Sequence, residues 1–115
     1  MEDKARIAQR IADALKYFGG FVYQDSLDRH EDVMSVVREA GLAFLLNTVV
    51  IDRRQRIYAL LLNDKRCQVQ CAHSSGCPED DDICKEKCLE DCRKELIDKV
   101  VEALNRYAER IKRKH

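Results

Sequence analysis

The residues best suited to chemistry in this 115-residue sequence are its six cysteines, all of which lie between residues 67 and 92. Paired from the outside inward, they form three pairs that share a centre close to residue 80. Facing residues of an antiparallel hairpin are likewise arranged around one common centre in the sequence. Such bonds would staple the segment 67–92 into a hairpin and stabilise the fold by about 2–4 kcal/mol each. The spacing therefore predicts the following disulfides: Cys67 with Cys92, Cys71 with Cys88, and Cys77 with Cys84.

A structural zinc ion is the main alternative for the same cysteines. Zinc accepts four Cys or His ligands in a tetrahedral arrangement, and His73 could replace one cysteine. The close cysteine pairs, however, have CxxxC spacing, whereas zinc knuckles and redox centres use CxxC. We therefore expect disulfides and no cofactor.

An acidic cluster precedes the second predicted helix and comprises Asp25, Asp28, His30, Glu31 and Asp32. Carboxylates and imidazoles of this kind can hold a hydrolytic metal ion. The cluster matches no spaced ligand motif, and its composition is that of a solvated loop followed by an acidic first helical turn. We expect no catalytic residues, no metal site and no enzyme activity, with a metal-dependent nuclease as the third-ranked function.

Arginines concentrate at two places in a chain whose 21 basic and 21 acidic residues cancel, so attraction to nucleic acid must come from a local patch. If residues 52–73 formed a helix antiparallel to the last one, the pairing of Cys67 with Cys92 would bring residue 53 opposite residue 106. The alternative is a solvated helix face. We expect one surface that binds the backbone of RNA or DNA, formed by the following side chains: Arg53, Arg54, Arg56, Arg106, Arg110 and Arg113.

The composition indicates a thermophile protein, because 37% of the residues are charged, tryptophan is absent and proline occurs once. Intracellular proteins of hyperthermophilic archaea and bacteria are those in which disulfides persist inside the cell. The first residues alternate charged and apolar groups, unlike a secretory signal, and no apolar run approaches the ~20 residues that cross a bilayer. We expect a cytoplasmic, archaeal-type protein without a membrane partner.

Helical periodicity supplies the elements that must position these groups. Apolar residues recur at spacings of three and four over residues 3–18, 31–44 and 84–111. Residues 42–62 can form a β-hairpin at about 43–62, or the second helix can continue and Asp52 can cap a third. The i,i+4 spacing of Cys67 and Cys71 favours the helix. We therefore expect one domain, residues 1–115, that is mainly α, with four helices and a disulfide-stapled C-terminal helical hairpin; an α+β fold is the alternative.

Two local resemblances suggest functions. The stretches VVREAGL and RQRIYAL resemble the end of a recognition helix and the wing strand of winged-helix regulators. Gly41 with LAFL, Tyr58 with the leucines at 60–62, and the basic closing helix EALNRYAERIKR resemble the small all-helical subunit of CRISPR effector complexes. The second resemblance implies a non-catalytic subunit that lies along a guide or target strand and contacts protein or nucleic-acid partners. We rank it first, and a DNA-binding regulator, such as those of viruses, second.

Overall fold

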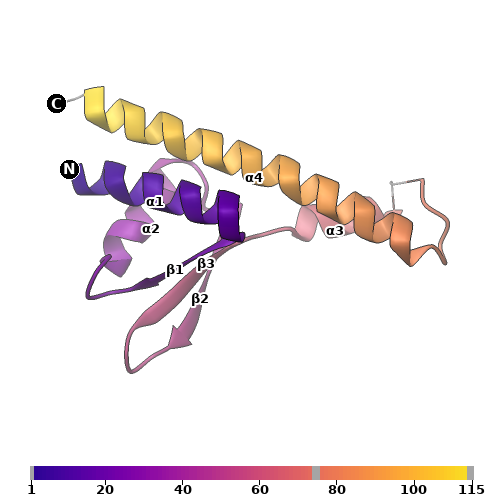
Figure 1. The fold of residues 1–115 in the computed structure, drawn as a ribbon, viewed down its shortest axis with the longest axis horizontal. Helices are drawn as coiled ribbons and strands as arrows, with labels where there is room; N and C mark the ends of the chain where they lie inside the picture. Colours follow the sequence, from indigo (N-terminus) through magenta and orange to yellow (C-terminus); the bar gives the residue numbers. More distant parts are fainter. Residues whose placement is uncertain (1, 74–75, 114–115) are drawn as a thin grey trace.

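The computed structural model describes residues 2–73 and 76–113. Four helices accompany one small sheet (Figure 1), so the expectation of a mainly helical chain is met, but only in part. In chain order the elements are α1 (Glu2–Phe18), β1 (Gly20–Gln24), α2 (His30–Glu39), β2 (Leu46–Asp52), β3 (Ile57–Leu62), α3 (Lys65–His73) and α4 (Asp82–Arg113).

The sheet has the order β1-β3-β2, and both pairings are antiparallel. Its register places Val22 and Val49 on either side of Ala59. Successive side chains of a strand point to opposite faces, and the buried Phe21 and Tyr23 of β1 alternate with the exposed Val22. One face of the sheet therefore joins the core and the other faces outward.

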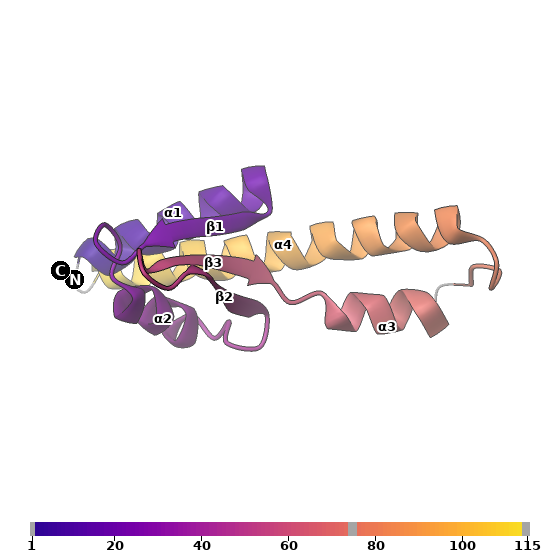
Figure 2. The same ribbon diagram turned by 90° about the horizontal axis from the view of Figure 1, so that it is seen from below.

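The core lies between this inner face and three helices. Helix α1 packs chiefly against the C-terminal half of α4, which runs back alongside it so that the start of α1 and the end of α4 lie near each other (Figures 1 and 2). The helical periodicity of both segments explains this packing, since each presents one apolar stripe. The largest fully buried side chains of the core are Ile11, Leu15, Val33, Val36, Leu60, Val100 and Leu104.

Residues 46–62 form a β-hairpin, so the preferred prediction of a helix there is wrong and the alternative hairpin at about 43–62 is confirmed. Helix α2 ends because Gly41 adopts a φ of 76°, a left-handed conformation that suits glycine. The N–H of Leu42 then donates to Val37 O at 2.9 Å and that of Gly41 to Arg38 O at 3.0 Å, which is a Schellman ending. The third helix accordingly begins at Lys65 and not at Asp52.

Helix α3 and the first part of α4 project from the rest of the molecule as an arm, residues 64–73 and 76–92 (Figure 2). The molecule measures 52 × 37 × 21 Å, and the arm extends along its longest axis. Three disulfides hold the arm together, with Cα–Cα distances of 5.7, 5.7 and 5.8 Å. They are the pairs that the concentric spacing predicts: Cys67–Cys92, Cys71–Cys88 and Cys77–Cys84.

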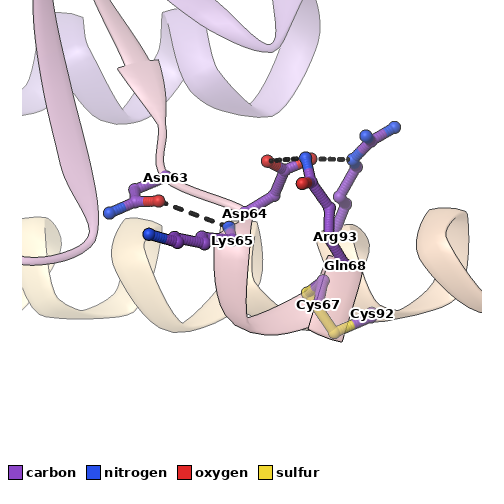
Figure 3. A network of polar contacts seen from close by, with 7 residues as sticks. All are labelled: Asn63, Asp64, Lys65, Cys67, Gln68, Cys92 and Arg93. Carbon is purple, nitrogen blue, oxygen red and sulfur yellow. Dashed lines mark hydrogen bonds and ion pairs between the residues drawn. A yellow bond between two sulfur atoms is a disulfide. The ribbon is translucent and has the colours of Figure 1, made fainter. Parts of the chain in front are cut away.

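The base of the arm is fixed by polar contacts where β3 passes into α3 (Figure 3). Asp64 accepts from Arg93 Nε at 2.5 Å and from Gln68 Nε2 at 3.0 Å, and Asn63 Oδ1 accepts from the Lys65 N–H at 3.3 Å. All six cysteine sulfurs are used in disulfides, so the zinc alternative would require their reduction.

Candidate nucleic-acid interface

The tip of the β2–β3 hairpin, residues 53–56, has a fixed shape. Asp52 Oδ1 accepts the backbone N–H groups of Arg54 at 2.9 Å and Gln55 at 3.0 Å, which is the local bonding that aspartate favours in turns. Arg56 then adopts a φ of 55° and leads into β3. The side chains of Arg53 and Arg54 are exposed on this ordered tip.

Arg56 ties the tip to the loop after β1. Its guanidinium Nη1 lies 3.3 Å from Asp25 Oδ2, and its carbonyl oxygen accepts the Asp25 N–H at 3.0 Å. Gln24 Nε2 also donates to the carbonyl of Gln55 at 3.2 Å. Because Asp25 partly neutralises Arg56, the exposed positive charge of the tip comes mainly from Arg53 and Arg54.

The six arginines do not form one surface, so the predicted juxtaposition of residues 53 and 106 is wrong. It required a continuous helix from residue 52, and the hairpin instead carries the tip away from α4 (Figure 1). Arg106, Arg110 and Arg113 lie exposed on the last turns of α4. Arg106 donates to Glu102, and the guanidinium of Arg110 lies 5.9 Å from the centre of the Tyr107 ring.

Three members of the acidic cluster, Asp25, Asp28 and His30, make structural contacts. Asp28 is only 2% exposed, and both of its carboxylate oxygens lie 2.5 Å from Nη1 of Arg10. Asp25 Oδ1 accepts the backbone N–H of His30 at 2.7 Å and so satisfies one of the free N–H groups in the first turn of α2. Sequence reasoning missed Arg10, because the pair joins residues 18 positions apart and no local pattern marks them.

His30 belongs to an aromatic stack. Its ring centre lies 4.2 Å from that of Tyr58, and its Nδ1 lies 2.7 Å from the Tyr23 hydroxyl. Burial, with smaller effects of Tyr58 and Asp25, raises the pKa of Tyr23, so its hydroxyl keeps its proton beside the His30 ring. Within the described part of the chain, no group of three or more His, Cys, Asp or Glu side chains is arranged to hold a metal ion.

Comparisons with known proteins identified no relative of this chain, so its function is argued from the geometry described above. No protein-family model matches this chain, and neither does any curated protein or solved structure. None of the described helices has the length and apolar character needed to cross a membrane.

Proposed function

We propose that this protein binds the phosphate backbone of duplex DNA, without reading its sequence, through the tip of the β2–β3 hairpin. The observation that carries the proposal is the pair of exposed arginines, Arg53 and Arg54, on a tip whose backbone Asp52 holds in place. A positioned arginine side chain suits phosphate oxygens, and contacts of this kind position a protein on DNA without specifying a sequence.

The order of elements supports a winged-helix-like arrangement. A helix, a strand, a second helix and a hairpin follow one another, and the first strand joins the hairpin through β3 in the order β1-β3-β2. In this arrangement the hairpin is the wing. This chain has the single helix α2 between β1 and β2, where helix-turn-helix proteins place two helices.

The charges on α2 favour the hairpin over this helix as the DNA contact. Its first turn carries Glu31 and Asp32, and its last residue is Glu39. Carboxylates there would be repelled by phosphates as the helix entered a groove. We therefore place α2 away from the major groove and assign binding to backbone contacts of the tip.

An interaction subunit of a larger assembly is the second candidate, and the projecting arm favours it. The resemblance to the small subunit of CRISPR effector complexes implied helices over LAFL and over residues 57–62. The first stretch is a turn and the second is β3. We rank this candidate below DNA binding, propose no catalytic activity for either, and place the protein in the cytoplasm of a thermophile.

The test compares two double charge reversals in a fluorescence-anisotropy titration of a duplex oligonucleotide. Arg53→Glu with Arg54→Glu should weaken binding and reduce the slope of log K against log salt by about 1.8, from about 0.9 per lost phosphate contact. Arg110→Glu with Arg113→Glu makes the same change in net charge on α4 and should leave most of the slope intact. Equal losses from both variants, or no binding of wild type at low salt, would contradict the proposal. Tighter binding of single-stranded RNA than of duplex would favour the second candidate.

A further inference from the structure

Strand β2 is an edge of the sheet that lacks the usual protection. Among the described residues, the strand order leaves one side of β2 without a neighbouring strand, and β2 borders the sheet in Figure 2. Natural edges are commonly guarded by charges, proline or bulges. In a chain with 37% charged residues, Leu46 to Ile51 contain none, and the bulge lies only at the far end, between Val50 and Asp52. Val49, Val50 and Ile51 are 45%, 48% and 55% exposed.

The backbone of this edge is set for an antiparallel neighbour. The N–H of Asn63 donates to Leu45 O at 2.8 Å, which fixes one bonded pair between the two segments of the hairpin. Bonded and non-bonded pairs alternate along an antiparallel ladder, so Val49 also bonds to β3. The N–H and C=O groups of Thr48 and Val50 therefore point away from β3, toward the open side.

We propose that β2 pairs with β2 of a second copy of this chain, antiparallel, with Val49 opposite its counterpart. Thr48 then faces Val50 of the other copy on each side of the two-fold axis. Each such pair exchanges two backbone hydrogen bonds, and the two sheets become one sheet of six strands.

Charge and side-chain chemistry favour a second copy as the occupant of this edge. In this register Leu46 faces Asp52 of the other copy, so no like charges are opposed, and valine meets valine at the centre. A charged peptide would find no charged side chain to pair with between Leu46 and Ile51. The outward face, which carries the exposed Val22 and Val49 on either side of the buried Ala59, would also continue across the axis as one apolar surface.

If the proposed function holds, the dimer would also determine how the two hairpin tips are spaced on DNA. The proposal of the dimer itself does not depend on DNA binding. Arg54 lies in the turn, five residues from Val49, and a strand rises at most about 3.4 Å per residue, so the two tips would lie up to about 34 Å apart. One turn of B-DNA measures about 34–36 Å. Both tips could therefore contact one face of a duplex, one helical turn apart.

Sedimentation equilibrium of the oxidised protein tests the dimer directly. Wild type should reach twice the 13.4 kDa chain mass as its concentration rises. Val50→Pro removes an outward N–H and should give a monomer. Val22→Pro is the matched control, because the same alternation points its N–H away from β3 on the opposite edge, and it should still dimerise. A wild-type monomer at every concentration up to the solubility limit, or a Val50→Pro dimer as stable as wild type, would overturn the proposal.

A second variant keeps the test decisive if a proline substitution prevents folding. Non-bonded antiparallel pairs hold their Cα atoms about 4.5 Å apart, within the range of a disulfide. Val49→Cys should therefore form a covalent dimer on mild oxidation, and Val22→Cys should not; similar yields from both would count against the β2 interface.

In DNA footprinting, wild type should protect two zones of the DNA backbone that lie one helical turn apart. A dimer that does not bind DNA would refute the proposed function alone, and one protected zone from a monomer would refute the dimer alone.

Discussion

Arg10 of α1 holds Asp28, in the loop before α2, through contacts of 2.5 Å to both carboxylate oxygens. The two partners differ in exposure, since 45% of the Arg10 side chain is accessible but only 1% of the Asp28 side chain. The guanidinium also lies 5.6 Å from the centre of the Phe21 ring. Arg10 thus connects α1 to the loop and to β1 at a single point.

This difference in exposure predicts unequal costs for removing each partner. Arg10→Met leaves a carboxylate buried without its cation and should lower the free energy of unfolding by about 3–5 kcal/mol. Asp28→Asn should cost less, about 1–3 kcal/mol, because the arginine can turn into water. Urea unfolding of the two variants measures both values. Equal and small costs would mean that the pair does not stabilise the loop.

The three disulfides should contribute according to the loops that they close. Their sequence separations are 25, 17 and 7 residues, for which the loop-entropy model gives about 3.5, 3.1 and 2.4 kcal/mol. Replacing Cys67 and Cys92 together by serine should therefore lower the melting temperature more than replacing Cys77 and Cys84. Calorimetry gives the two temperatures, and mass spectrometry of non-reduced digests checks the pairing. Stoichiometric zinc or six free thiols in protein purified without reductant would contradict it.

The sequence was informative wherever a pattern was local or symmetric. The apolar stripes located α1, α2 and α4, and the concentric cysteines located the arm, because both depend on spacing along the chain. Residues 46–62 were ambiguous because a short apolar run fits a helix and a strand equally well. The i,i+4 spacing of Cys67 and Cys71 did indicate a helix, but that helix begins only at Lys65.

The candidate site was less accessible to sequence reasoning. The exposed arginines of the hairpin were identified, but their assignment to one surface with Arg106 depended on the wrong element. The role of Asp28 depends on Arg10 in another helix, and the open edge of β2 depends on strand order. Such relations arise from the tertiary arrangement, so no spacing in the chain reveals them. The clearest missed signal was Gly41, which ends α2 and thereby makes the hairpin possible.

Gly41 should therefore be sensitive to substitution for backbone reasons alone. Its φ is 76°, and a Cβ added there would meet no atom within 4 Å. Gly41→Ala should cost about 1–2 kcal/mol through the left-handed conformation. Gly41→Asn should cost less, because asparagine adopts this conformation more readily. Denaturant unfolding of both variants distinguishes this cause from crowding, which would make the larger asparagine the more destabilising residue.

The lowered pKa of the Glu39 carboxyl should make the stability of the fold depend on pH. Hydrogen bonds from Lys4 and from the Tyr107 hydroxyl, each 2.9 Å long, lower the pKa of its carboxyl below the ordinary 4.5. A carboxyl whose pKa is lowered by folding stabilises the fold above its ordinary pKa, and this stabilisation disappears as pH falls through the folded-state value. Wild type should exceed Glu39→Gln in stability at pH 7 by less than about 1 kcal/mol, because the pair is substantially exposed.

The stability curves of these two proteins should converge on acidification below about pH 4.5. Tyr107→Phe removes one of the hydrogen bonds that lower this pKa and should show a smaller acid-dependent loss than wild type. Thermal unfolding across the acid range measures all three. Parallel curves for wild type and Glu39→Gln would show that these hydrogen bonds do not favour the ionised carboxylate.

Reduction should loosen the arm and leave the rest of the fold intact. The main core cluster draws its buried side chains from α1, α2, the sheet with its adjoining turn, and the C-terminal half of α4, and none of its buried members lies in residues 64–92. Within the arm, Cys67 and Cys71 are buried chiefly by the disulfide-linked packing of α3 on α4.

After mild reduction, trypsin should cut first at Lys85 and Lys87, while the near-ultraviolet signal of Tyr23 and Tyr58 in the sheet persists. The oxidised protein is the control and should resist cleavage at these lysines. DNA binding through Arg53 and Arg54 should survive reduction, because the hairpin tip is held by Asp52 and Asp25. Loss of the tyrosine signal together with the disulfides would instead show that the arm and the core unfold as one unit.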